Sequence, residues 1–234
     1  MAYMLVSPRE KLLQAIRLVT LSPSTLAYTK SIVYFPTCAM VEYFYPLLSK
    51  LFEFANHKVI SLHGQLPPSA RKKNFELFCN LTTTSTVLLT TDVAARGLDV
   101  PNVDLVVQLD PPQDPKNFSH RCGRAGRAGQ PGRAVLFLHQ GREEEYVQFL
   151  KVRGIPVEAV HRLDSTGGTL QRDDDTAVDD LVTRFRQHVQ LDRGLHDKVF
   201  TRSVSENSAL GHESVSVVYT SLFETSGKFY LQDQ

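Results

Sequence analysis

The run Val87-Leu88-Leu89-Thr90-Thr91 decides the fold class of this 234-residue chain. Its apolar residues are consecutive and do not alternate with polar ones, which is typical of a strand buried on both faces of a parallel sheet. Four other short runs are similarly rich in strand-forming residues. They predict strands at residues 31–35, 58–63, 103–109 and 133–139.

Segments with apolar residues at helical spacing separate these strands. They predict helices at residues 7–21, 39–52, 67–79, 114–127 and 143–153. Ser7 and Glu10 have the spacing of a capping box. Asp114-Pro115 is typical of a helix start, and Pro46 should kink or divide its helix. Strands that alternate with helices predict an α/β fold, a parallel sheet with helices on both faces.

The composition of the chain changes after Gly154. Residues 165–175 contain paired glycines and three aspartates, which predicts a flexible linker. Apolar residues then return at helical spacing from Thr176 to Leu191 and predict a further helix. The Ser/Thr-rich end has no such period and predicts a disordered or weakly held tail. We therefore expect an N-terminal helix and linker (1–29), the α/β domain (30–155), a linker with a helical extension (156–200) and the tail (201–234).

The overall charge and the cysteines narrow the class of protein. A net charge of +1 gives no global attraction to nucleic acid, so an anion site must be local. The three cysteines are odd in number and lack CxxC spacing, which argues against a disulfide framework or a zinc site. The first residues do not form a signal peptide, and no apolar run reaches about 18 residues. We expect a soluble, intracellular protein with no membrane partner.

The stretch from His120 to Arg127 is the strongest candidate for such a local anion site. Arg121, Arg124 and Arg127 recur at three-residue steps, which would align them along one side of a helix. Guanidinium groups in a row repel one another unless an anion such as phosphate lies between them. The interleaved glycines suggest that another surface approaches this backbone closely. The plainer alternative is a solvated basic loop.

Other candidate residues follow the predicted strands. Thr91-Asp92 comes directly after one of them and leads to Arg96-Gly97-Leu98-Asp99, and His63-Gly64 follows another, with Arg71 on the next helix. Each feature by itself more often has a structural role. An Arg-Gly-Leu-Asp sequence usually forms a turn, two threonines at a strand end usually complete the strand pairing, and His63 is more often a histidine of the core. Ligands of parallel sheets, however, gather where the strands end. The joint occurrence of these features therefore favours a binding edge.

Four motifs occur in a fixed order along this α/β chain: Ser31 to Thr37, Leu62-His63-Gly64 with Arg71, Thr91 to Asp99, and His120 to Arg127. In this order they resemble the second RecA-like domain of DEAD-box ATP-dependent RNA helicases, over residues 30–155. Narrower features resemble the nucleolar, chiefly fungal, branch that acts on precursor ribosomal RNA in large-subunit assembly. They are Asp110-Pro111-Pro112, Cys122 within the arginine motif, Tyr146 to Leu150, and Asp192 to Lys198.

The resemblance implies an ATP site. It places Arg124 and Arg127 at the γ-phosphate, with Arg127 as the arginine finger, where a guanidinium is worth about 10³ to 10⁵ in rate. It implies that His120 and Arg121 couple this motif to the acidic ATPase motif of the other helicase domain. Asp99 would accept hydrogen bonds from the ribose hydroxyls.

The resemblance also implies an RNA track. Thr91 and Gly97 would meet phosphates through a hydroxyl and a backbone N–H, and Thr37, Gly64 and Arg71 would extend the track. Such contacts hold the RNA backbone without reading its sequence. ATP binding would close both domains around a single RNA strand and bend it. Because a duplex cannot adopt this bend, domain closure would separate its strands.

This sequence departs from the family pattern in ways that matter for activity. It contains no GxxxxGK[ST] loop and no Asp-Glu-Ala-Asp motif, so ATP hydrolysis by the chain alone is not expected. The missing N-terminal RecA-like domain would hold ATP and Mg²⁺. Pro68 stands where the family has a glutamine three residues before Arg71, which weakens that RNA contact.

We therefore expect half of an ATP-dependent RNA helicase of the nucleolus, acting on precursor rRNA in 60S subunit biogenesis. Its partners would be this RNA, the N-terminal RecA-like domain and proteins of the pre-60S particle. One alternative is a truncated, catalytically inactive RNA-binding module. A third reading is a nucleotide-binding domain unrelated to helicases, which should bind ATP by itself.

Overall fold

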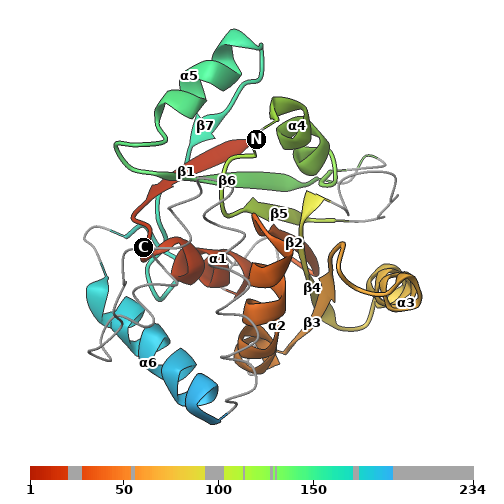
Figure 1. Cartoon of the computed structure of the whole chain (residues 1–234). Coiled ribbons are helices and arrows are strands. Elements are labelled where there is room, and N and C mark those ends of the chain that lie inside the picture. The colour runs from red at the N-terminus through yellow and green to blue at the C-terminus, as the bar shows by residue number, and fades with distance from the viewer. Residues whose placement is uncertain are drawn as a thin grey trace, which may run out of the picture.

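A computed structural model of the chain shows seven parallel strands in one sheet, in the order β3-β4-β2-β5-β6-β1-β7 (Figure 1). The structure describes residues 1–20, 28–53, 56–92, 103–112, 114–126, 129, 131–170 and 174–191. The strands are β1 (Ala2–Val6), β2 (Lys30–Tyr34), β3 (His57–Leu62), β4 (Ser85–Thr90), β5 (Leu105–Gln108), β6 (Arg133–His139) and β7 (Glu158–Ala159). The helices are α1 (Lys11–Thr20), α2 (Cys38–Glu53), α3 (Pro68–Asn80), α4 (Pro115–Cys122), α5 (Glu145–Val152) and α6 (Asp175–Leu191).

Two hydrophobic clusters cover the two faces of the sheet, because successive side chains of a strand point to opposite faces. In β2, Val33 belongs to one cluster, whereas Ile32 and Tyr34 belong to the other. Helices α1, α2 and α6 pack on the first face, and α3, α4 and α5 on the second (Figure 1). This arrangement confirms the predicted α/β class with helices on both faces.

The N-terminal residues differ from the prediction. Residues 2–6 form β1, which lies between β6 and β7 inside the sheet, and α1 contributes to the same core. The folded unit thus begins well before the expected boundary at residue 30. The capping-box residues do touch, since Ser7 Oγ donates to Glu10 Oε2 (3.0 Å), but they close a turn and the helix starts only at Lys11.

Two predicted helix features also need correction. Pro46 does not divide helix α2, because the buried face of this helix, which includes Phe44, Leu47 and Leu48, packs along the sheet and outweighs one lost hydrogen bond. Helix α4 ends at Cys122, with Gly123 as its C-cap, and does not extend to residue 127. The predicted cap at its start is confirmed, as Asp114 accepts a hydrogen bond from the Lys116 N–H (2.9 Å).

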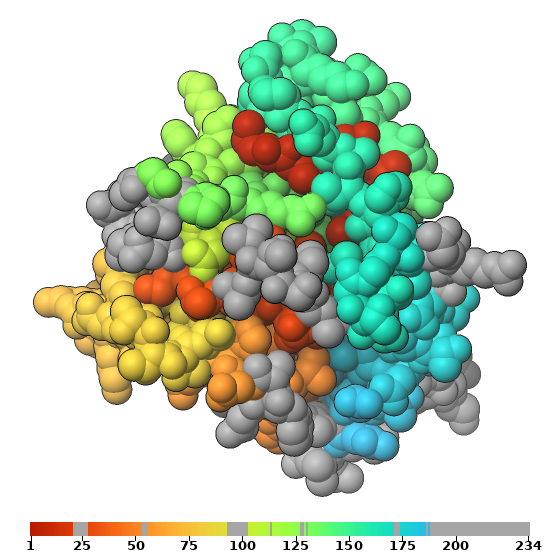
Figure 2. Space-filling model, turned by 180° about the vertical axis from the view of Figure 1, so that it is seen from behind, coloured from red at the N-terminus to blue at the C-terminus, as the bar shows by residue number. Residues whose placement is uncertain are grey.

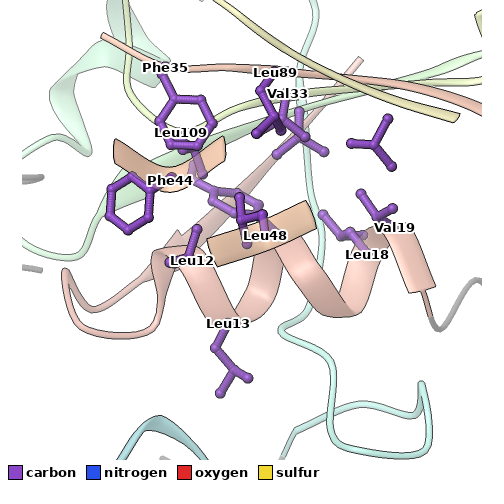
Figure 3. Close-up of a cluster of buried hydrophobic side chains, with 14 of the residues drawn as sticks. Leu12, Leu13, Leu18, Val19, Val33, Phe35, Phe44, Leu48, Leu89 and Leu109 are labelled. Atoms are coloured by element: carbon purple, nitrogen blue, oxygen red, sulfur yellow. The ribbon is translucent and has the colours of Figure 1, made fainter. Parts of the chain in front are cut away.

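Helix α1 is enclosed on two sides. Leu12, Leu18 and Val19 point to the sheet in Figure 3, whereas Leu13 points the opposite way. On that opposite side lies α6, which buries Val178, Leu181, Val182 and Phe185. In Figure 2 the extension runs as a band along one side of the molecule. The expected helix at 176–191 is therefore confirmed, and the expected tail at 201–234 lies outside the described residues.

Candidate functional site

The carboxyl ends of β3, β4 and β2 lie next to one another in the sheet and bring three predicted RNA-binding residues to one edge. Gly64 follows β3 and is exposed, Thr91 follows β4, and Thr37 follows β2. Thr91 Oγ1 lies 3.9 Å from Cys38 Sγ, which joins the β4 and β2 ends. Thr37 Oγ1 accepts from the Met40 N–H (3.2 Å), so this hydroxyl caps α2.

The loop after β3 is held from inside the protein. His63 is buried, and burial lowers its pKa from 6.5 while Glu42, 3.8 Å from Nδ1, works in the opposite direction. The His63 carbonyl accepts from the Leu66 N–H (3.2 Å) and closes the turn that exposes Gly64. Arg71 is half-buried in the first turn of α3, and Pro68 is the first residue of this helix. A proline suits that position because it has no N–H to satisfy.

Arg121 lies at the centre of a buried polar network behind this edge. Its Nε donates to Asp92 Oδ1 (2.7 Å), and its Nη1 donates to Gln108 Oε1 (3.3 Å) and to the Asp110 carbonyl (3.4 Å). Its guanidinium carbon lies 5.0 Å from the centre of the Tyr34 ring. Arg121 therefore joins α4 to the ends of β4 and β5.

Burial also decides the chemistry of the groups beside Arg121. It raises the pKa of the Cys122 thiol to about 12, although the hydrogen bond from Gln108 and the nearby Arg121 charge oppose it. It raises the pKa of Tyr34 as well. Both groups stay protonated near neutral pH, so neither provides a nucleophile or a base here.

The other arginines of the motif are in different surroundings. Arg124 lies beyond the end of α4 and is only half-buried, with Nε donating to the His120 carbonyl (3.2 Å), and His120 itself is exposed. The predicted alignment of the three arginines along one helix is therefore wrong. Arg127, Gly97 and Asp99 lie outside the described residues.

A close contact between two glycines fixes the segment after Arg124. A Cβ added to Gly132 would lie 2.1 Å from the Gly126 nitrogen, a distance that only glycine avoids. Gly126 has a φ of 69° and donates its N–H to the Val103 carbonyl (3.3 Å). The expected close approach is thus present at Gly126, and it comes from Gly132 at the start of β6.

Sequence reasoning missed several residues of this site. Asp92 belongs to one of the sequence motifs, but the sequence does not show that it pairs with Arg121. The ion pair forms because the fold brings the chain after β4 close to α4. Gln108 and Asp110 are almost fully buried. Both are polar residues at the end of an apolar strand, and this pattern could have indicated a buried hydrogen-bond network.

Within the described ranges, no group of three or more His, Cys, Asp or Glu side chains could hold a metal ion. All three cysteines are free thiols. No helix of the described part is long and apolar enough to cross a bilayer. At the strand-end edge Gly64 is exposed and Arg71 is half-buried, whereas Thr37 and Thr91 are buried. Backbone N–H, hydroxyl and guanidinium groups are the usual donors to phosphate oxygens.

Comparison with known proteins shows which proteins this chain resembles. Residues 10–129 match the family model described as helicase conserved C-terminal domain. The ATP-dependent rRNA helicase spb4 of Sclerotinia sclerotiorum is 44% identical over 222 residues, which cover 94% of this chain and 33% of the relative. The protein of the same name from Schizosaccharomyces pombe is 45% identical over 196 residues, 83% of this chain and 31% of the relative. The chain thus spans about a third of these relatives.

Solved structures agree with the fold. The C-terminal domain of the DEAD-box protein Dbp5 superposes with a TM-score of 0.55 at 28% identity, covering 68% of this chain and 88% of that one. Domain 2 of the DEAD-box helicase Mss116p, bound to an RNA duplex, gives a TM-score of 0.71 at 19% identity, with coverages of 95% and 86%.

Proposed function

The chain belongs to the helicase conserved C-terminal domain family, and from this premise we propose that it is the second RecA-like half of a DEAD-box ATP-dependent RNA helicase. The observation that carries the proposal is the strand-end edge, which brings Thr37, Gly64 and Thr91 to the neighbouring ends of β2, β3 and β4. The likeness to rRNA helicases supports precursor rRNA as the substrate, in 60S subunit biogenesis in the nucleolus. Proteins of the pre-60S particle are proposed as further partners.

In this proposal the arginine motif serves ATP hydrolysis. Arg124 and Arg127 stabilise the charge that develops on the γ-phosphoryl oxygens, and Asp99 binds the ribose. The half-buried Arg124 fits this role because its own backbone segment is pinned by Gly126 and Gly132. His120 and Arg121 would transmit closure from the other domain. ATP and Mg²⁺ would be held by the N-terminal RecA-like domain, where the metal ion neutralises phosphate charge.

The RNA track completes the proposed mechanism. The exposed backbone at Gly64 and the end of β4 at Thr91 offer donors to successive phosphates, and Gly97, Thr37 and Arg71 extend the line. Because Thr37 Oγ1 already caps α2, we assign its contribution mainly to positioning that helix terminus. Contacts of this kind hold the backbone alone, so the separation of strands comes from domain closure.

The decisive experiment uses the chain joined to the N-terminal part of the Sclerotinia sclerotiorum relative. RNA-stimulated ATP turnover is expected, and Arg127→Ala should lower kcat by about 10³-fold because it removes the arginine finger. Arg184→Ala is the control, since Arg184 is exposed on α6 and forms an exposed ion pair with Asp180. Unchanged turnover in Arg127→Ala would show that the finger is elsewhere.

The exposed Gly64 and the half-buried Arg71 favour a second candidate, an RNA-binding module without its own ATPase. It predicts that the isolated chain binds single-stranded RNA, with an affinity that falls as salt rises from about 50 to about 200 mM. Fluorescence anisotropy measures this, and no binding at the lower salt rejects the module. The reading as a nucleotide-binding domain unrelated to helicases is wrong, given the family match.

A further inference from the structure

A buried ion cluster lies beside the arginine network but outside the proposed contacts with ATP and RNA. Lys11 Nζ lies 2.8 Å from Asp110 Oδ1 and 3.2 Å from Glu143 Oε2. The side chains of Lys11 and Asp110 are only 2% and 3% exposed. These residues are 99 and 132 positions apart in sequence, so the cluster exists only in the folded protein.

The cluster joins three elements at the carboxyl edge of the sheet. Lys11 is the first residue of α1, and Asp110 follows β5. Glu143 Oε2 also accepts from the N–H of His139, the last residue of β6 (2.7 Å). The cation thus sets the spacing between the ends of two neighbouring strands.

Asp110 connects this cluster to the arginine network. Its carboxylate faces Lys11, while its backbone carbonyl accepts from Arg121 Nη1 (3.4 Å). Arg121 in turn donates to Asp92 Oδ1 at the end of β4 (2.7 Å). A continuous line of contacts therefore runs from Lys11 through Asp110 and Arg121 to Asp92.

Stability alone does not explain a charge at this position. A buried ion pair often contributes no more to stability than apolar side chains of the same volume, because desolvation offsets the attraction. Its directional contacts do fix geometry. Here they fix Asp110, which lies four positions before Asp114, the N-cap of α4. They therefore also fix where α4, the helix that carries Arg121, begins.

We propose that Lys11 is a positioning residue for the arginine motif, acting through Asp110 on Arg121. This inference rests on the proposed function for its effect on ATP turnover, but not for its effect on Arg121. Loss of the Lys11 cation lets Asp110 and the start of α4 shift, which misplaces the motif relative to the phosphates. A misplacement lowers kcat more than it changes the KM for ATP, since binding is mainly the task of the other domain.

The test has two arms with the same variants. In the 234-residue chain, the Nε–H signal of Arg121 is followed by nitrogen–proton NMR and assigned by its loss in Arg121→Lys. Lys11→Met should displace it, whereas Arg9→Met should not, because Arg9 forms an exposed ion pair with Asp179 of α6. In the joined protein, Lys11→Met should lower kcat about tenfold or more, with the KM for ATP changing less than about twofold.

The double variant Lys11→Met/Asp110→Asn guards against a folding defect, because it leaves no unpaired Asp110 carboxylate. It should show the same displaced signal and the same loss of kcat. An unmoved Arg121 signal in folded Lys11→Met, or an unchanged kcat, overturns the inference. A displaced signal together with an inactive wild-type joined protein supports the inference and rejects the proposed function instead.

Discussion

Arg121 and Arg124 belong to one short motif, yet the fold gives them different tasks. Arg121 is buried, and it donates hydrogen bonds to Asp92, Gln108 and the Asp110 carbonyl. Arg124 lies past the helix end and is half-buried. A buried guanidinium with directional partners organises structure, whereas an accessible one can meet a ligand. We therefore predict that Arg124, rather than Arg121, contacts a ligand directly.

His63 should make stability depend on pH. Burial lowers its pKa in the folded state from 6.5, so below about pH 6.5 the unfolded chain takes up a proton that the folded protein resists. The stabilisation is present above that pH and is lost as pH falls toward the folded value. Urea unfolding at several pH values should show a shallower acid loss in His63→Gln, with the exposed His161→Gln as control. Identical profiles for wild type and His63→Gln would refute this.

Cys122 should be the least reactive thiol. Burial raises its pKa to about 12, so the thiolate is nearly absent at pH 8. Cys38 and Cys79 are half-buried and should react first with iodoacetamide, as followed by mass spectrometry. All three should react equally in urea. Labelling of Cys122 in the native protein as fast as Cys79 would contradict the burial.

At the scale of elements, the short helix α4 shows how packing sets a boundary. Three-residue spacing suggested that the helix would continue to Arg127, but it stops at Cys122, where Gly123 donates its N–H to the Ser119 carbonyl (2.8 Å). The backbone then turns to reach Val103 and the start of β6. Contacts with distant strands thus override the local helical period.

Gly132→Ala should displace the segment that follows Arg124. Its Cβ would collide with backbone atoms of Gly126 and Ala125, at 2.1 and 2.7 Å, and backbone cannot yield cheaply. We expect a loss of about 2 kcal/mol in unfolding free energy, in the range of overpacked sites. Urea denaturation of the 234-residue chain measures it. Pro131→Ala, at the exposed neighbouring position, is the control and should change stability much less.

At the scale of the whole molecule, α1 and the turn before it link the extension to the rest of the domain. The Gln14 amide and the Leu163 backbone exchange two hydrogen bonds (3.0 and 2.8 Å), and Arg162 Nη1 donates to the buried Glu10 Oε2 (2.8 Å). Arg17 donates to the Leu163 carbonyl (2.8 Å) and to Asp174 Oδ2 (2.6 Å). The hydrogen bond from Arg17 lowers the pKa of Asp174.

Arg17→Met should loosen α6 without unfolding the sheet. It leaves the Leu163 carbonyl and Asp174 without their guanidinium donor, which weakens the docking of the extension. Hydrogen exchange followed by mass spectrometry should show faster exchange in 175–191 and little change in β4 or β5. Arg9→Met should have a smaller effect, because exposed pairs contribute little. Equal exchange in both variants would mean that apolar packing alone holds α6.

The sequence by itself determined the parallel sheet, since continuous apolar runs such as Val87 to Leu89 encode burial on both faces locally. It also determined the Asp114 cap and the helix at 176–191, whose signals lie within a few residues. Only the tertiary structure decided that residues 2–6 enter the sheet, that Arg121 is buried while Arg124 is not, and that Lys11 meets Asp110. Those outcomes depend on strand order and on contacts between residues about a hundred positions apart. The local spacing of apolar residues contains no information about such contacts.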